Sequence, residues 1–370
     1  MKIASFNIQN LFHRDNEIQE YSVGCNLKSW MEEFHMLMGR PTRGENELTR
    51  LRELAFLMGF SNTVTEPYLV LRRNGGQHFV MAQGLEHERK ATSKVGWNGW
   101  VALKSSPIHE KAVRHKLQLL AEMDADILIL QEVEDRKSLL EFNNLLRHKY
   151  KKDPYRYVNH IEGNDSNGRG MAVLSKNGYS IISTSSNAHV QMGQKKLLFG
   201  MDCPLISVLT PTGKQLVIIN AHLTENSVES DSHSLRKKQA SFIADMYSET
   251  LAKGIENILI SGTLNGPSYA DALSPLVRDT HLMDISKHDG FAANLDIGNA
   301  REYYRLGAYR KGINIKQFDY MLCSPILFSK LANCGMDRRG LWKCEHPNWP
   351  IFTSLRCKEH RASSHPLLWG

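Results

Sequence analysis

The sequence lacks the long apolar runs, the dense cysteines and the leader segment that mark membrane-spanning and secreted proteins. No apolar stretch approaches the roughly 18 residues that a membrane-spanning helix needs. The opening residues, MKIASFNIQN, contain no charged start followed by an apolar segment, so we predict no secretory signal. The 6 cysteines of the 370-residue chain are scattered and do not form a disulfide framework. We therefore expect a cytoplasmic protein with no membrane partner.

Internal repeats, low-complexity tracts and clear linkers are also absent, which excludes repeat architectures. Hydrophobic residues make up 41% of the chain, enough for a large core. A length of 370 residues is long for one domain, although α/β domains reach it. We predict a single domain over residues 1–370. The stretch at about 11–110, with its RRNGGQH and GWNGW segments, reads as an insertion or lid.

Acidic residues are outnumbered by basic ones, 39 to 46, which gives a net charge of +7 and a pI near 9.0. A basic balance favours polyanionic partners. Each basic cluster alone is well explained as a solvated loop or helix face. Together they favour nucleic acid as the partner, with a protein partner left open. The clusters lie at 147–156, 236–239, 309–316 and 337–343.

Short β-branched runs that end in polar residues recur along the chain and predict strands. Amphipathic patterns between some of them predict helices over 231–251, 113–121 and 48–58. Apolar strands that alternate with such helices are typical of α/β proteins, in which helices cover a sheet. The predicted strands lie within 2–10, 127–130, 170–176, 215–225, 257–265 and 318–324.

Amide, carboxylate and imidazole side chains stand at the ends of these strands. Such groups, each at the exit of a different strand, suit a site for a hard divalent cation and a phosphate. Hydrolysis of a phosphodiester there also needs a positioned water, a base and stabilisation of the developing charge. The strand-end residues are Asn7, Glu132, His222, Asn265 and Asp319, and His365 follows in the C-terminal RASSHPLLW segment.

These residues lie in motifs that resemble the endonuclease/exonuclease/phosphatase superfamily, whose fold is deoxyribonuclease I-like. More narrowly, the sequence is similar to bacterial members with a long N-terminal insertion. The resemblance runs in order over nearly the whole chain and implies a four-layered α/β sandwich, with two packed β-sheets flanked by helices. The motifs are ASFNIQNLF, DADILILQEVED, GNDSNGRGMAVLS, DCP, INAHLTE with RKKQA downstream, GTLNGP, FDYMLCSP, DRRGLW and SSHPLLW.

The resemblance also implies roles for individual residues. Asn7 and Glu132 match a metal-binding pair, for Mg²⁺ or Mn²⁺. His222 matches a residue that contacts or protonates the scissile phosphate, and Asn265 matches one that orients the phosphate or the attacking water. For Glu132 the functional interpretation is favoured independently, because an acid beside an apolar strand is unusual. Asn7 and Asn265 are equally explained as turn residues that bond to their own backbone.

The remaining matched pair is Asp319 and His365. The resemblance implies that Asp319 accepts a hydrogen bond from His365, the catalytic histidine. Taken alone, Asp319 is equally explained as a strand-end cap. His365, like His222, is equally explained as an ordinary surface histidine or a core histidine with satisfied hydrogen bonds. The motifs taken together support all of these assignments at once, and no single motif supports one of them alone.

Two positions depart from the family pattern. Family members carry Gly-Asp-x-Asn where this chain has GTLN at 262–265, and Ser-Asp-His where it has SSH at 363–365. Thr263 and Ser364 thus stand at positions where aspartates are expected. A threonine hydroxyl cannot act as a general base near neutral pH, and removal of such a base costs about 10²–10⁴ in rate. Loss of a second acid lowers the affinity for Mg²⁺.

Two functions remain open from the sequence. The first is a pseudoenzyme with a degenerate site, weakly active or inactive, that binds a phosphate-bearing or protein partner. The second is an active metal-dependent nuclease or phosphodiesterase in which Asp165, Asp202 or the metal alone compensates for the missing acids. The superfamily also includes inositol phosphatases and sphingomyelinases, so the fold does not choose the substrate. A third, minor hypothesis is a zinc site formed by Cys344, His346, Cys357 and His360.

Overall fold

The computed structural model describes residues 1–15, 24–57, 69–73, 77–79, 99–103, 105–165, 168–192, 196–225, 231–293, 317–342 and 349–370. The chain divides into two units. Unit 1 contains Met1–Phe12, Ile108–Asn164 and Arg169–Gly370, and unit 2 contains His13–Pro107 and Asp165–Gly168. Unit 2 takes up most of the stretch that reads as an insertion or lid, and its role stays a prediction.

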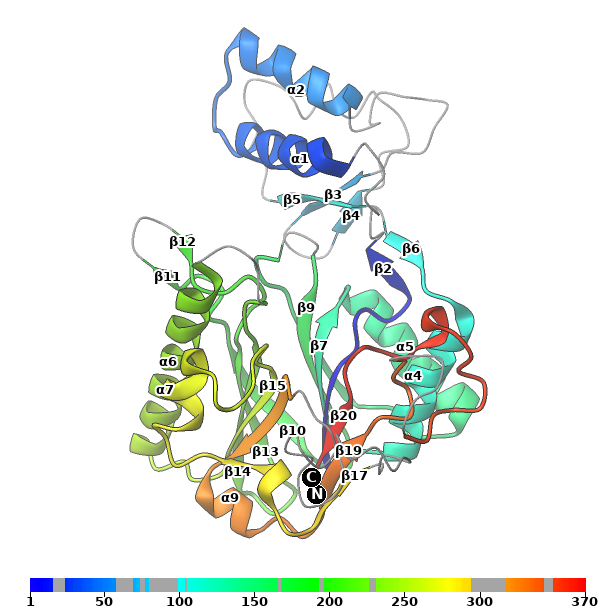
Figure 1. The fold of residues 1–370 in the computed structure, drawn as a ribbon, viewed down its shortest axis with the longest axis vertical. Coiled ribbons are helices and arrows are strands. Elements are labelled where there is room, and N and C mark those ends of the chain that lie inside the picture. The colour runs from blue at the N-terminus through cyan, green and yellow to red at the C-terminus, as the bar shows by residue number, and fades with distance from the viewer. Residues whose placement is uncertain are drawn as a thin grey trace, which may run out of the picture. The chain divides into compact units, whose positions relative to one another are not determined.

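The first sheet of unit 1 has 7 strands in the order β17-β19-β20-β1-β7-β9-β8 (Figure 1). The neighbouring strands β1 and β7 run parallel. Every residue of β1, β7 and β9 is buried, since both faces of the sheet are covered, and this explains their nearly continuous apolar sequences. The strands are β1 (Ile3–Asn7), β7 (Ile127–Val133), β8 (Tyr157–Ile161), β9 (Gly170–Ser175), β17 (Phe291–Ala293), β19 (Cys334–Asp337) and β20 (Leu367–Trp369).

The second sheet has 6 strands in the order β10-β13-β14-β15-β18-β16. β14 and β15 run parallel, whereas β15 and β18 run antiparallel. The register places Thr263 between His222 on one neighbour and Asp319 on the other, so three residues from separate motifs lie side by side. The strands are β10 (Ser180–Ser185), β13 (Leu205–Leu209), β14 (Gln215–His222), β15 (Ile258–Thr263), β16 (Met283–Asp284) and β18 (Asp319–Cys323).

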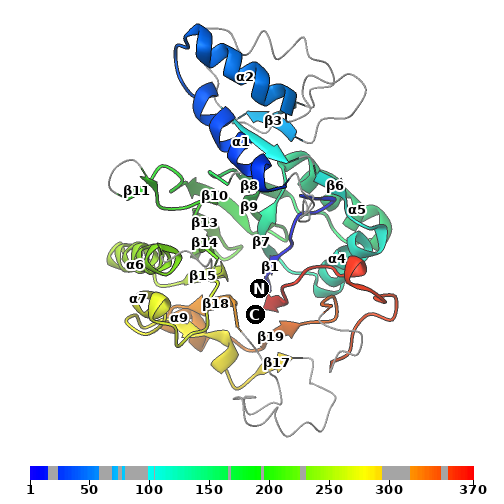
Figure 2. The same ribbon diagram turned by 45° about the horizontal axis from the view of Figure 1, so that its top comes forward.

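Three buried apolar clusters separate four layers (Figure 2). Alternation along the strands sends Phe6 toward helices α4 and α5 and sends Ile3 toward the second sheet. In the second sheet, Ile219 packs toward α6 and α7, whereas Ile218 faces the first sheet. The predicted four-layered α/β sandwich is therefore confirmed. The covering helices are α4 (Glu110–Met123), α5 (Arg136–Tyr150), α6 (Asp231–Ala252) and α7 (Ser274–Val277).

The predicted elements are found in the structure. The six predicted strands correspond to β1, β7, β9, β14, β15 and β18, and the helix predicted over 231–251 is α6. The helix predicted over 113–121 lies within α4, and that over 48–58 overlaps α2 (Glu45–Leu57). Of the helices that the structure describes, none combines the length and the hydropathy that crossing a bilayer requires.

The described residues of unit 2 form the helices α1 (Gly24–Met38) and α2 and two small sheets. The guanidinium of Arg50 in α2 donates to both carboxylate oxygens of Glu33 in α1 at 2.8 Å, which ties the two helices together. The strands of unit 2 are β2 (His13–Asp15), β3 (Leu69–Arg73), β4 (Gln77–Phe79), β5 (Gly99–Leu103) and β6 (Ser105–Pro107). The remaining elements of unit 1 are β11 (Gln191–Met192), β12 (Lys196–Leu197), α9 (Pro325–Ser329) and the 3₁₀ turns Asp271–Leu273, Ile285–Lys287 and Lys358–His360.

Candidate active site

Polar side chains from both sheets meet at the edge of the sandwich where the parallel strands end. β1 ends at Asn7, β14 at His222 and β15 at Thr263. The carboxyl ends of parallel strands lie at one edge of a sheet, and this edge is where α/β proteins place their ligands. The amide of Asn7 joins the two sheets, because its Nδ2 donates to Glu132 of the first sheet and to Thr263 of the second.

Glu132 is directed toward this edge by an irregularity in β7. The pairing of β7 with β9 shifts register between Gln131 and Val133, and Glu132 has a φ of 58°. This left-handed conformation is unusual for a residue with a side chain and persists only where the surroundings hold it. β-Bulges re-aim side chains and are frequent beside functional sites. The bulge supports the functional interpretation of Glu132.

The buried carboxylate of Glu132 accepts three hydrogen bonds. Its Oε1 accepts from Asn7 Nδ2 at 2.7 Å and from His222 Nε2 at 3.1 Å, and its Oε2 accepts from Arg169 Nη1 at 3.0 Å. Burial by itself would raise the pKa of Glu132. The hydrogen bond from His222, the charge of Arg169 and the Asn7 amide outweigh burial and hold the pKa of Glu132 well below its usual range. Glu132 is therefore ionised at neutral pH.

Asp319 and His365 form a second polar pair at the same edge. The ring nitrogen Nδ1 of His365 donates to Asp319 at 2.9 Å from Oδ2 and 3.0 Å from Oδ1. Burial lowers the pKa of His365, but the charge and hydrogen bond of Asp319 outweigh this and raise it above its ordinary value. The pairing implied by the resemblance is present. It directs the other ring nitrogen, Nε2, away from Asp319.

Thr263 links the two groups of residues. Its hydroxyl donates to Asp319 Oδ1 at 2.7 Å and accepts from Asn7 Nδ2 at 3.0 Å. A continuous series of hydrogen bonds thus runs from Glu132 through Asn7 and Thr263 to Asp319 and His365. The hydroxyl proton is thus engaged by the carboxyl group of Asp319. This arrangement explains how a threonine fits a position where the family pattern predicts an acid.

The raised pKa of His365 leads to a prediction about its titration. In the unmodified chain, the imidazole should titrate above its ordinary pKa of about 6.5. In Asp319→Asn, the pKa should fall below that value, because burial remains and the compensating charge is lost. The stability that this pair contributes is present at low pH and is lost as pH rises through the raised pKa. NMR titration of the His365 ring measures the pKa, and an unchanged value in Asp319→Asn contradicts the assignment.

Two of the predicted site residues lie beside this series and not within it. Asn265 has a left-handed φ of 52°, and its Nδ2 donates to the backbone oxygen of Leu223 at 2.7 Å. The left-handed φ fits a turn residue, but the amide bonds to the backbone of a distant segment and not to its own, and the role of Asn265 toward a phosphate stays a prediction. Ser364 is exposed, and both its backbone nitrogen and its hydroxyl donate to Gln9 Oε1 at 2.8 Å.

Two residues at the site were missed by the sequence reasoning. Arg169 pairs with Glu132, and Glu225 lies close to Glu132 and His222. One ligand atom from each of Glu132, His222 and Glu225 lies within 4.8 Å of the others, so the three could hold a metal ion. Both missed residues stand inside motifs quoted above, GNDSNGRGMAVLS and INAHLTE, but nothing local distinguishes them from surface charges.

The donor set of Glu132, His222 and Glu225 fits a divalent cation. Carboxylates are the ligands that Mg²⁺ prefers, and an imidazole is better suited to transition metals than to Mg²⁺. Among the residues that the structure describes, this is the one cluster with metal-ligand geometry. The zinc hypothesis stays a prediction, because Cys344 and His346 lie outside the described residues.

Of the two acids that the second hypothesis names as compensating for the missing pair, Asp202 is engaged by backbone groups. Asp202 is buried, and its Oδ1 accepts from the backbone nitrogens of Asn187 at 2.8 Å and Cys203 at 2.7 Å. These contacts support a loop of the second sheet. Asp165 belongs to unit 2 and is not placed relative to the site. Glu225 is the additional carboxylate beside Glu132.

No family model and no curated protein matches the sequence. Solved structures do match. An endonuclease/exonuclease/phosphatase from Bacteroides vulgatus is 14% identical with a TM-score of 0.45, and the match covers 70% of this chain and 88% of that chain. Truncated TDP2 from Caenorhabditis elegans is 16% identical with a TM-score of 0.44 and coverages of 70% and 90%. Sphingomyelinase C from Streptomyces griseocarneus is 16% identical with a TM-score of 0.43 and coverages of 69% and 90%.

The first of these structures carries the superfamily name that the sequence motifs suggest. The three names differ in the kind of protein that they describe, so they do not choose a substrate for this chain.

Proposed function

We propose that unit 1 binds phosphate esters at this edge of the sandwich and hydrolyses them weakly or not at all. Its role would be to hold a phosphate-bearing or protein partner, and the net charge of +7 favours nucleic acid. The observation that carries the proposal is the Thr263 hydroxyl, which lies between Asn7 and Asp319 where the family pattern predicts a carboxylate. A hydroxyl in this place supports the shape of the site without supplying a general base.

The groups that would hold the phosphate are donors in the same site. The raised pKa of His365 extends the pH range over which its ring carries a positive charge, and Nε2 points away from Asp319. The guanidinium of Arg169 is a planar donor suited to phosphate oxygens. A bound phosphate ester would compete with Glu132 for this guanidinium. Because the His365 ring and the Arg169 guanidinium are donors that need no metal, we expect the chain to bind phosphate esters without added metal.

A second candidate function is metal-dependent hydrolysis of a phosphodiester, as in a nuclease. The intact pair of Asp319 and His365 favours it, and so does the carboxylate of Glu225 beside Glu132. Glu132, Glu225 and His222 would hold Mg²⁺ or Mn²⁺, which would stabilise charge on the phosphate. His365 would then carry the proton that is transferred at Nε2, while Asp319 holds the ring in position.

The test is a paired binding and cleavage assay on fluorescent DNA and RNA oligonucleotides, with Mg²⁺ or Mn²⁺ and with EDTA. We expect anisotropy to show binding in EDTA, weakened roughly tenfold or more in His365→Ala because a charged hydrogen bond is lost. We expect cleavage no faster than that of His365→Ala. His281→Ala, at an exposed histidine outside the four basic clusters, is the matched control and should behave like the unmodified chain.

Two results would decide against the first proposal. Metal-dependent cleavage by the unmodified chain that His365→Ala abolishes would establish the second candidate. Absence of both binding and cleavage would exclude both functions for these substrates.

A further inference from the structure

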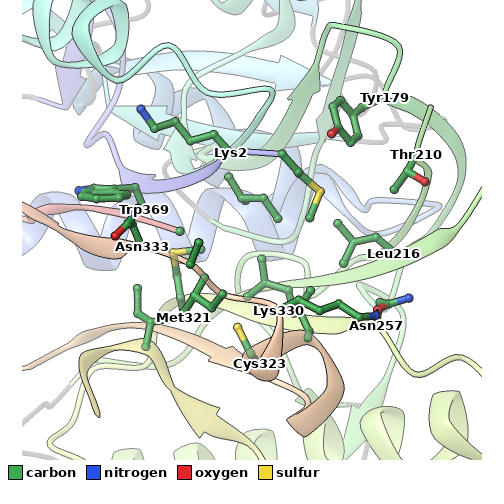
Figure 3. Close-up of a pocket in the computed structure, with 18 of the residues that line it drawn as sticks. Lys2, Tyr179, Thr210, Leu216, Asn257, Met321, Cys323, Lys330, Asn333 and Trp369 are labelled. Atoms are coloured by element: carbon green, nitrogen blue, oxygen red, sulfur yellow. The ribbon is translucent and has the colours of Figure 1, made fainter. Parts of the chain in front are cut away.

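A pocket of about 860 Å³ opens between the two sheets, at the edge opposite to the candidate active site (Figure 3). Ile3 and Trp369 line it from the first sheet, and Leu216 and Met321 line it from the second. Leu216 is at the start of β14, and His222 is at the other end of that strand. At about 3.3 Å per residue, the strand separates the two places by roughly 20 Å.

The wall of the pocket is continuous with the apolar layer between the sheets. Ile3, Leu216, Leu259 and Met321 belong both to the lining and to the buried cluster that joins the sheets. Ligand pockets of proteins are mostly apolar, have volumes of about 300–1,000 Å³ and carry a few polar groups. Figure 3 shows Trp369 and Asn333 on one side of this pocket and Tyr179, Thr210 and Leu216 on the other.

The charged side chains around the pocket all have the same sign. Lys2, Lys214 and Lys330 line it, and no aspartate or glutamate side chain is among the described lining residues. Lys2 Nζ donates to the backbone oxygen of Met123 at 2.9 Å, and Lys330 Nζ donates to Asn257 Oδ1 at 2.7 Å. Both partners are neutral. Within the described part of the chain, neither Lys214 nor Lys330 forms an ion pair with a side-chain carboxylate, so both can face an anion at this rim, whereas Lys2 points toward the end of α4.

We infer that this pocket binds a long-chain fatty acid. The acyl chain lies against the apolar wall between the sheets, and the carboxylate lies at the rim beside the ammonium groups of Lys214 and Lys330. A neutral apolar ligand would leave the lysines without a counter-charge, and a small inorganic anion would leave the apolar wall uncovered. A single acyl chain with an anionic head satisfies both. This site is independent of the phosphate site proposed above.

The inference is tested by displacement of a fluorescent fatty acid, dansyl-undecanoate, from the full chain. Oleate should displace it saturably and more effectively than oleyl alcohol, which has the same chain without the charge. In Lys214→Glu/Lys330→Glu, oleate should bind about tenfold more weakly or worse, because two cations have become anions. Oleyl alcohol should be little affected. Both lysines are exposed, so the variant is expected to fold.

Two further variants test whether oleate binds in the pocket itself or responds only to the net charge of the chain. Ala332→Trp places a large ring at an exposed position of the lining and should weaken both ligands. Arg147→Glu/Lys149→Glu makes the same change in net charge on exposed positions of α5 and should bind oleate like the unmodified chain. The inference is overturned if the unmodified chain shows no saturable oleate binding. It is also overturned if the α5 variant loses as much affinity as Lys214→Glu/Lys330→Glu.

Discussion

Replacement of Thr263 and Ser364 together by aspartate is expected to raise metal-dependent phosphodiester cleavage by about 10²–10⁴ over the unmodified chain. The hydroxyl of Thr263 is 2.7 Å from Asp319 Oδ1. A carboxylate in its place would lie beside a second carboxylate. Two acids at such a distance cannot both ionise readily, so one pKa is raised. A carboxyl group whose pKa approaches neutrality is what general acid–base catalysis requires.

The second substitution, Ser364→Asp, supplies negative charge for the cation. Ser364 is exposed and is held through Gln9, so an aspartate there adds an oxygen ligand without disturbing the core. The measurement is the initial rate of cleavage of a DNA oligonucleotide and of bis-p-nitrophenyl phosphate, at equal protein and Mg²⁺ concentrations. His365→Ala in the restored background should remove the gain.

The matched control for this prediction is Thr263→Val/Ser364→Ala, which keeps the approximate size of both side chains and adds no acid. It should show no gain in rate. Equal rates for the unmodified, restored and control chains would mean that the missing acids are not what limits hydrolysis.

Replacement of Glu132 by alanine is expected to lower the free energy of unfolding by about 3 kcal/mol. The Glu132 carboxylate is the shared acceptor for Arg169, His222 and Asn7. Its removal leaves the Arg169 guanidinium without its counter-charge and leaves the His222 ring and the Asn7 amide without their acceptor. Breaking a buried ion pair lowers the free energy of unfolding by several kcal/mol. We take the lower end of that range, because the Arg169 side chain is 21% exposed. Urea unfolding followed by circular dichroism measures the change.

The same prediction has a defined pH dependence. The pKa of Glu132 is held below its usual range in the folded chain, so its contribution is present above the unfolded pKa of about 4.3. That contribution is lost as pH falls toward the depressed pKa. The difference in unfolding free energy between the unmodified chain and Glu132→Ala should thus be largest near neutral pH and smaller in acid.

An exposed pair provides the control for this second prediction. Glu110 and Arg114 in α4 are 3.1 Å apart with side chains 80% and 55% exposed. Glu110→Ala should cost less than about 1 kcal/mol, because solvent screens such a pair. A loss in Glu132→Ala no larger than that in Glu110→Ala would show that Glu132 does not hold the charges at this edge together.

The sequence by itself predicted six strands and three helices, and the family resemblance of its motifs implied the layered arrangement. The strands at 127–130 and 215–225 and the helix at 231–251 are visible in the local pattern because burial on one or both faces selects apolar residues at fixed spacing. The motif order also indicated that Asp319 and His365 would pair, and the structure places them in contact.

Only the tertiary structure decided which side chains are hydrogen-bond partners in the site. The partners of Glu132 come from positions 7, 169 and 222, and a bulge in β7 directs its side chain. Register and bulges arise from pairing between strands that are distant in sequence, so a local pattern does not encode them. For the same reason Arg169 and Glu225 read as ordinary charges until the folded chain brings them beside Glu132.

Thr263 and Ser364, the two positions that differ from the family pattern, also show what the sequence determines and what only the fold determines. That Thr263 and Ser364 carry hydroxyl groups and no acid is plain in the sequence, and so is the chemical consequence, because a hydroxyl is not a general base. That the Thr263 hydroxyl bridges Asn7 and Asp319, while Ser364 lies exposed against Gln9, depends on the packing of the two sheets. Residue chemistry is local, whereas its hydrogen-bond partners are set by the fold.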